Sequence, residues 1–97
     1  MDKVWCIATG VLSETGALSF VEWDENVSLY NGGTGDTHLL NLFPFEVLLS
    51  LVPGHGTIAS ISMHMAAICG EEDNQQWRSN ILKILMQLEE LELVDCQ

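Results

Sequence analysis

Apolar and polar positions alternate loosely between residues 17 and 41, and turn-forming residues interrupt the alternation twice. The interruptions are WDEN at 23–26 and GGTG at 32–35. Because a period of two is typical of half-buried strands, this pattern predicts a three-stranded antiparallel β-meander. Side chains two apart share a face of a strand, so one face is expected to carry Leu18, Phe20, Val27, Leu29 and Leu39, and the other Val21, Trp23, Tyr30, His38 and Leu40.

Helical spacing replaces the alternation after Asn41 and predicts two helices before residue 70. Asn41 can cap a short helix that ends near Leu51. That helix is apolar almost all round, so it should be a buried central element. Thr57 can cap the second helix, and Gly70 is placed to end it.

A third helix is expected over residues 74–92, with Asp73 as its N-cap. An apolar stripe on it should face the core and consists of Trp77, Ile81, Ile84, Leu85, Leu88 and Leu91. A second group lies about 120° to 140° from the centre of that stripe and contains Arg78, Leu82, Met86 and Leu93. A solitary surface helix would be polar there, so a dimer partner, the N-terminal segment 4–12 folded back, or a ligand in a groove should cover this group.

Together these segments predict one α+β domain of winged-helix-like architecture, in which a three-stranded antiparallel β-meander precedes three α-helices. A chain of 97 residues leaves room for a single domain over 1–97. Residues 1–12 are expected to form an N-terminal arm or strand.

The charge balance narrows the range of partners. Three Lys and Arg against fourteen Asp and Glu give a formal net charge of −11, and such a surface repels phosphate backbones and anionic lipid. Segment 57–70, the recognition helix of a DNA-binding winged helix, contains no Lys or Arg. No apolar run approaches the roughly 20 residues of a membrane span, and no signal-peptide pattern is present. We therefore expect a cytoplasmic protein with no nucleic-acid or membrane partner.

Residues with catalytic or metal-binding chemistry form no recognisable constellation. The glycine-rich nucleotide motifs and the nucleophile motifs are absent from the sequence. Neither the three histidines nor the three cysteines show a ligand or disulfide spacing. Asp36 and His38 would share a strand face, but without a nucleophile or a pocket they are best explained as polar cross-strand contacts. We expect no enzyme activity, no metal and no cofactor.

One stretch of the sequence points to a family. Residues 18–51 contain W-D-E-N, then L-Y-N, then G-D-T-H-L-L-N and the apolar helix P-F-E-V-L-L-S-L. In this order the stretch resembles the PqqD family of peptide chaperones, and more narrowly the branch that accompanies HPr-kinase-related proteins, the HPr-rel-A system. The most characteristic piece is G-D-T-H-L-L at 35–40, and the resemblance extends over residues 12–95.

This resemblance implies a RiPP recognition element, a small non-enzymatic domain that captures the leader segment of a ribosomally made precursor peptide and presents it to modifying enzymes. It also implies that the leader adds as a strand beside the third strand, with its side chains in a cleft against the last helix. The matching positions are Asp36, Thr37, His38, Leu39 and Leu40 on the strand and Arg78, Leu82 and Met86 on the helix. The implied partners are the precursor peptide and a modifying or kinase-related enzyme, and the negative charge favours basic character in one of them.

Several alternatives stay open at this level. A winged-helix interaction or dimerisation module without a peptide strand is the alternative function. Arg78 can either anchor a carboxylate of the cargo or pair with Glu71, Glu72 or another internal acid. A homodimer is also open, because an unpaired edge strand recruits other chains and the N-terminal segment can be exchanged between copies.

Overall fold

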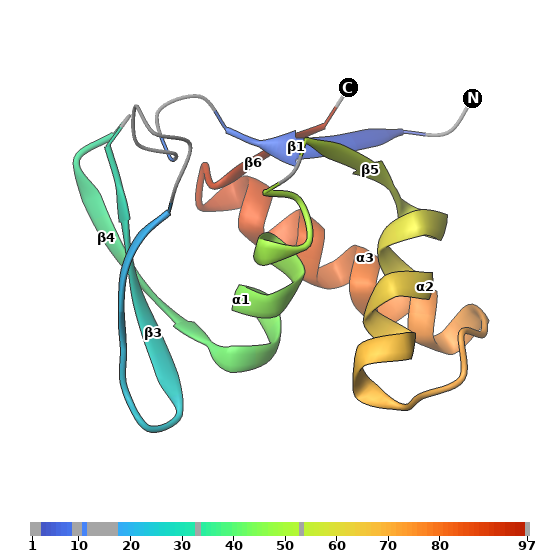
Figure 1. Ribbon diagram of the computed structural model, residues 1–97. Coiled ribbons are helices and arrows are strands. Elements are labelled where there is room, and N and C mark those ends of the chain that lie inside the picture. The colour runs from blue at the N-terminus through green and yellow to red at the C-terminus, as the bar shows by residue number, and fades with distance from the viewer. Residues whose placement is uncertain (1–2, 9–10, 12–17, 33, 53, 97) are drawn as a thin grey trace.

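Two three-stranded antiparallel sheets and three helices make up the described chain (Figure 1). This computed structural model describes residues 3–8, 11, 18–32, 34–52 and 54–96. The elements are β1 (Val4–Ile7), β2 (Ser19–Glu22), β3 (Asn26–Asn31), β4 (Asp36–Asn41), α1 (Leu42–Leu49), β5 (His55–Thr57), α2 (Ile58–Cys69), α3 (Gln75–Glu90) and β6 (Val94–Cys96). The expected α+β class, with a β-meander followed by helices, is confirmed.

Strands β2, β3 and β4 form the expected meander, in that order across the sheet. At the first turn the amide of Trp23 donates to the carbonyl of Asn26 over 2.7 Å, and at the second the amide of Gly35 donates to the carbonyl of Asn31 over 2.8 Å. Gly35 has a φ of +82°, a left-handed conformation that glycine adopts without steric cost. These two turns set the register of the three strands.

The structure corrects the expected faces of β4. Directly opposite residues on antiparallel strands point to the same side, and Val27 lies opposite Leu40 while Leu29 lies opposite His38. Leu40 and His38 therefore share the inner face with these partners, and Leu39 points outward, where it is 66% exposed. The sequence predicts the reverse because two adjacent leucines are equally apolar, so the period of two does not say which one is buried.

Helix α1 is the central element, as its almost wholly apolar sequence predicts. It contacts α2, α3, β3 and β4. Asn41 holds the predicted N-cap position, but its side chain makes no capping hydrogen bond. The ring of buried Phe45 has its centroid 4.8 Å from that of Phe20 in β2, and Phe43 meets Trp77 of α3 edge-on at 5.7 Å. Helix α1 therefore links the meander to α3.

Both ends of α2 form as predicted. Thr57 accepts a hydrogen bond from the amide of Ser60 in a capping box, and Gly70 ends the helix with a φ of +69°. A Cβ at Gly56, just before the cap, would lie 3.0 Å from the Ser60 hydroxyl and 3.1 Å from Ile61, so a side chain there would have to displace these neighbours. The small residue lets strand β5 run directly into the helix.

The N-cap of α3 is one residue later than the sequence predicts. Asn74 is the capping residue, and its side chain accepts a hydrogen bond from the amide of Trp77 over 2.9 Å. Asp73, the expected cap, instead accepts two hydrogen bonds from Arg78. The prediction was wrong because Asp and Asn are equally good N-caps, and here a charged partner is within reach of the aspartate.

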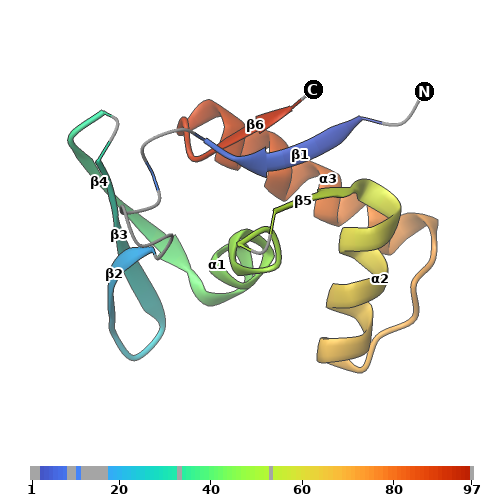
Figure 2. The same ribbon diagram turned by 45° about the horizontal axis from the view of Figure 1, so that its top comes forward.

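Strand β1 lies in the middle of the second sheet, whose order is β5–β1–β6. It pairs with β5 and β6, so the described part of the N-terminal segment is a strand folded back on this chain. Residues 1–2, 9–10 and 12 of the expected arm lie outside the described residues. Figure 2 shows this sheet lying across the helices and apart from the meander.

The second group on α3 is not fully covered by the folded-back segment. Leu82 and Met86 are 38% and 53% exposed, although Leu93 is buried.

Candidate functional site

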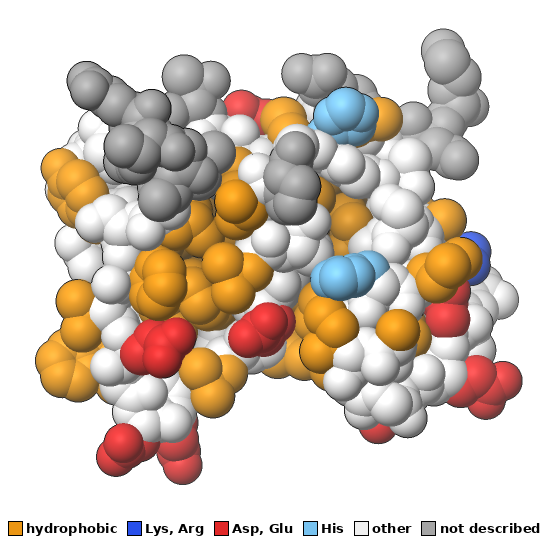
Figure 3. Space-filling view, viewed as in Figure 1, with side chains coloured by type: hydrophobic (Ala, Val, Ile, Leu, Met, Phe, Trp, Pro, Cys, Tyr) orange, Lys and Arg blue, Asp and Glu red, His pale blue; other side chains and the backbone are white. Residues whose placement is uncertain are grey.

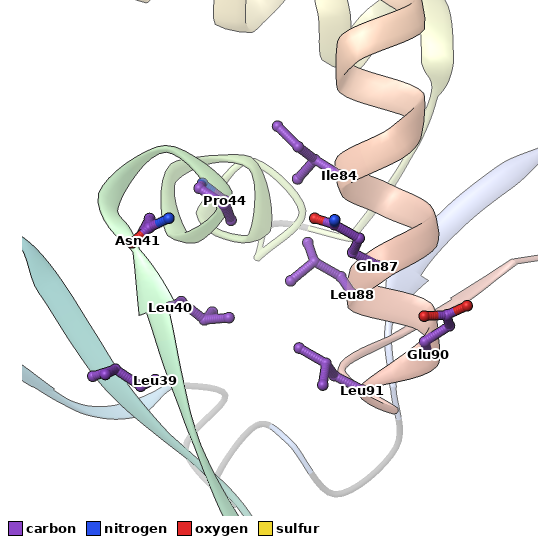
Figure 4. Close-up of a pocket in the computed structure, with 9 residues that line it drawn as sticks. All are labelled: Leu39, Leu40, Asn41, Pro44, Ile84, Gln87, Leu88, Glu90 and Leu91. Carbon is purple, nitrogen blue, oxygen red and sulfur yellow. The ribbon is translucent and has the colours of Figure 1, made fainter.

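A cleft of about 330 Å³ opens between β4 and α3 (Figure 4). It is lined by Leu39, Leu40, Asn41 and Pro44 on one side and by Ile84, Gln87, Leu88, Glu90 and Leu91 on the other. Leu40, Leu88 and Leu91 point toward one another across it, whereas Leu39 points to the far side of β4. The volume is at the lower end of the roughly 300–1,000 Å³ typical of ligand sites, which suits a few side chains of a larger partner.

The strand side of the cleft is a free sheet edge. Strand β4 is the last in the order β2–β3–β4, and no described strand pairs with its other edge. The hydrogen bond between Trp23 and Asn26 directs the backbone groups of residues 26, 28 and 30 toward β2, so those of 27, 29 and 31 point toward β4. On β4 the backbone amide and carbonyl groups of Thr37 and Leu39 therefore face the free edge.

The helix side of the cleft is one flank of α3. Leu88 is 1% exposed and lies deepest, Ile84 is half-buried, and Leu91 is 37% exposed. These residues share a side of the helix because they are spaced four and three apart. The apolar stripe of α3 is thus wider than the part that the core covers, and the uncovered border faces β4.

Negative charge gathers at the C-terminal end of α3. Glu89 and Glu90 occupy its last turn, Glu92 follows, and the last turn contains no basic residue. The carbonyl end of a helix already carries a partial negative charge, so these carboxylates add to it. Glu90 lines the cleft, and none of the three Lys and Arg residues of the chain does. This end of the cleft favours a positively charged group.

The strand residues expected at the site are only partly brought together. Leu39 and Leu40 line the cleft, whereas Asp36 and Thr37 are exposed on the same strand outside the lining. His38 is half-buried on the inner face, and its buried Nε2 atom has no hydrogen-bond partner in the part of the chain that the structure describes. The expected polar contact through this ring nitrogen is therefore absent among those residues.

The helix residues expected at the site lie on the other flank of α3, and none of Arg78, Leu82 and Met86 lines the cleft. Leu82 and Ile84 are two positions apart, which is about 200° around a helix, so Leu82 points away from the side that faces β4. Met86 follows Leu82 by four positions and shares its side. The expectation that this group meets the strand is corrected, because the border of the core stripe occupies that place.

Sequence reasoning does not assign Asn41, Pro44, Ile84, Gln87, Leu88, Glu90 and Leu91 to the site, although all of them line the cleft. A signal exists for two of them. Ile84 and Leu91 lie about 40° and 60° from Leu88 in the centre of the apolar stripe, toward one border of it. A residue at the border of the stripe can be buried or exposed. Which of the two applies depends on where β4 lies, and the sequence of α3 does not show that.

Arg78 makes an internal ion pair. Its Nε and Nη2 atoms donate to Oδ1 and Oδ2 of Asp73 over 3.1 and 3.2 Å. This hydrogen bond is the main reason that the pKa of the Asp73 carboxyl lies below its ordinary value, and the same pairing raises the pKa of Arg78. Of the two roles that the sequence leaves open for Arg78, the structure shows pairing with an internal acid.

Within the described ranges, no three His, Cys, Asp or Glu side chains gather closely enough to hold a metal ion. The cysteines are free thiols: Cys6 and Cys96 are half-buried, and Cys69 is exposed. The same ranges contain no helix long and apolar enough to cross a bilayer.

Fold and cleft together define a small α+β domain with a cleft along a sheet edge. No protein-family model matches the chain, and neither a curated protein nor a solved structure matches it.

Proposed function

We propose that this protein is a non-enzymatic peptide chaperone, which binds an extended segment of a precursor peptide along β4 and presents it to a modifying enzyme. The observation that carries the proposal is that a free strand edge and a cleft with leucine side chains on both walls coincide at Leu39 and Leu40. A free edge offers backbone hydrogen bonds, and a cleft beside it offers selectivity for side chains. Both are requirements of β-augmentation.

In this arrangement the peptide is a further strand of the meander. Its backbone bonds to the outward amide and carbonyl groups of Thr37 and Leu39. Alternate side chains of a strand point to opposite faces, so one set enters the cleft against Leu40, Leu88 and Leu91. The other set lies beside Leu39 on the outer face of the sheet.

The bound segment is expected to be basic where it meets the end of α3. Glu89 and Glu90 lie there at the negative end of the helix dipole, with no basic residue in that turn. A Lys or Arg of the peptide would gain from both. The kinase-related enzyme partner is implied by the PqqD resemblance alone, and the cytoplasmic location and the lack of a nucleic-acid partner stay predictions from composition.

A titration with matched variants tests the proposal. The probes are synthetic peptides of about 12 residues, longer than a typical strand, that tile the short reading frames next to the gene. We expect one of them to bind, and Ile84→Ala and Leu91→Ala each to weaken it by about fivefold, because each removes about 1 kcal/mol of apolar contact. Leu82→Ala and Met86→Ala, on the opposite flank of the same helix, should leave fluorescence-anisotropy titrations unchanged.

Amide hydrogen exchange supplies a second readout. Binding of a strand should slow exchange at Thr37 and Leu39, because their amides become hydrogen-bonded. An interaction or dimerisation module without a peptide strand predicts no such slowing. Equal loss of affinity in Leu91→Ala and Leu82→Ala would place the peptide elsewhere than in the cleft.

A further inference from the structure

The outer face of the meander is unusually apolar. Antiparallel sheets that cover a core on one side commonly present polar residues on the other. Here Val21, Trp23, Tyr30 and Leu39 are 55%, 60%, 46% and 66% exposed. Tyr30 alternates with the buried Leu29 along β3, and Val21 and Leu39 lie opposite Ser28, which also alternates with it. Trp23 follows Val21 by two positions. All four therefore belong to the outward side of the sheet.

These side chains form one connected surface. Val21, Ser28 and Leu39 lie directly opposite one another across β2, β3 and β4. The Nε1 of Trp23 donates to the hydroxyl of Ser28 over 2.9 Å, which holds the indole over the middle strand. The indole nitrogen therefore lies beside Ser28, whose strand neighbours on either side are the exposed Val21 and Leu39. We name Val21, Trp23, Ser28, Tyr30 and Leu39 the outer face.

The meander that carries the outer face is acidic. Residues 18–41 contain Glu22, Asp24, Glu25 and Asp36 and no Lys or Arg. In Figure 3 hydrophobic side chains lie at the left border of the molecule, over the meander, and acidic side chains lie at the tip of the β2–β3 hairpin below them. Two of the acids, Asp24 and Glu25, directly follow Trp23 in that turn.

We propose that the outer face docks a second protein whose contact surface combines apolar side chains with arginine. A guanidinium can stack on the exposed ring of Trp23 and bond to the carboxylates of Asp24 or Glu25, which a neutral or acidic group cannot do. A second copy of this chain fits poorly. It carries a net charge of −11 and would bring a second Asp24 and Glu25 against the same acidic turn.

The proposal does not require a peptide in the cleft. Leu39 belongs to both surfaces, but the outer face includes no residue of α3. A strand added to β4 would extend the outer face by its own outward side chains. A partner on this face would then contact the bound peptide as well. The surface that holds the peptide would thus also present it to the partner.

A peptide titration followed by NMR tests the outer face. The probes are acetyl-Arg-Leu-Arg-Leu-Arg-amide and its counterparts with Lys or Glu in place of Arg. Trp23 has its own indole signal, separate from those of Trp5, which is buried, and Trp77, which donates to the carbonyl of Ser62. We expect the arginine probe to shift the Trp23 indole and the amides of Val21 and Leu39. The lysine probe should bind about threefold more weakly and the glutamate probe should give no shift.

Variants separate the ring from the charges. Trp23→Ala should weaken binding of the arginine probe by about fivefold to tenfold. Unchanged indole signals of Trp5 and Trp77 would show that the variant is folded. Asp24→Asn combined with Glu25→Gln should weaken binding of the same probe by about threefold. The matched control, Glu71→Gln with Glu72→Gln, removes as much charge in the turn between α2 and α3 and should change binding little.

Three outcomes would overturn the proposal. Shifts confined to Ile84 and Leu91 would put the probe in the cleft. That result would refute docking on the outer face and leave the proposed peptide binding in the cleft unaffected. Equal binding of the arginine and glutamate probes would exclude charge recognition. Concentration-dependent shifts of Trp23 and Leu39 without any probe would make a second copy the occupant.

Discussion

The side-chain amide of Asn31 donates a hydrogen bond to the backbone carbonyl of Glu92 over 3.1 Å, and so ties the end of β3 to the turn after α3. Asn31 is 1% exposed, and its Oδ1 atom also accepts a hydrogen bond from the amide of Thr34 over 3.4 Å. Glu92 has a φ of +63°. The contact joins residues far apart in sequence next to Leu91, so it helps to fix the distance between the meander and the end of α3 at the cleft.

Replacing Asn31 should loosen this end of the molecule. Asn31→Ala removes the bonds to Glu92 and Thr34 and leaves a small void, which we expect to lower the free energy of unfolding by about 1–3 kcal/mol. Asn80→Ala is the control, since Asn80 is an exposed helical residue and should cost under about 0.5 kcal/mol. Urea denaturation measures both. Equal values for the two variants would show that the buried bond contributes nothing.

The left-handed backbone of Glu92 predicts a stabilising substitution. A side chain at a φ of +63° meets a steric penalty that glycine avoids, so Glu92→Gly should raise the free energy of unfolding by about 0.5–1 kcal/mol. Glu92→Gln keeps the penalty and removes the charge. If thermal unfolding shows the same gain for Glu92→Gln, relief of charge repulsion is the cause and the backbone argument fails.

The two flanks of α3 predict different costs of truncation. Leu85 is fully buried, so Leu85→Ala should lower the free energy of unfolding by about 2–5 kcal/mol. Leu82 and Met86 are 38% and 53% exposed, and truncation of either should cost less than about 1 kcal/mol. Denaturant titrations of the three variants give the comparison. A large loss in Met86→Ala would reveal a partner that covers this flank.

The pair of Asp73 and Arg78 predicts a pH dependence at the start of α3. The pKa of Asp73 is lowered in the folded chain by Arg78, so the pair contributes stability above the ordinary value of 3.8 and loses it as the pH falls through the lowered pKa. The difference in unfolding free energy between wild type and Asp73→Asn should therefore shrink in acid. Added salt should also reduce the difference. The same acid dependence in an Arg78→Gln background would refute the assignment to this pair.

Much of the fold follows from local patterns, and the failures have physical reasons. The turn at 23–26, the return of the chain from Asn31 to Gly35, the cap at Thr57 and the stop at Gly70 depend on the residues themselves, and the structure has them as predicted. Strands β5 and β6 have three residues each, too few to show any period. They exist because β1 lies between them, and pairing of distant segments leaves no local signal.

The candidate site is less predictable than the fold. The strand half of the cleft lies at the expected β4, where Leu39 and Leu40 line it. Sequence periodicity correctly assigns the stripe with Ile81, Leu85 and Leu88 to the core. It does not show that one border of this stripe, rather than the second apolar group, faces β4, because that depends on how the meander packs against α3.

The position of β1 also bears on the order in which the chain folds. The meander forms between neighbours in the sequence, whereas Val4 must find Thr57 and Ile7 must find Val94. Closing such long loops costs more chain entropy and slows folding, because the contacts stabilise only after the loop has closed. We therefore expect the meander and the helices to assemble first, with the cleft already in place, and the sheet of β5, β1 and β6 to close as the last step.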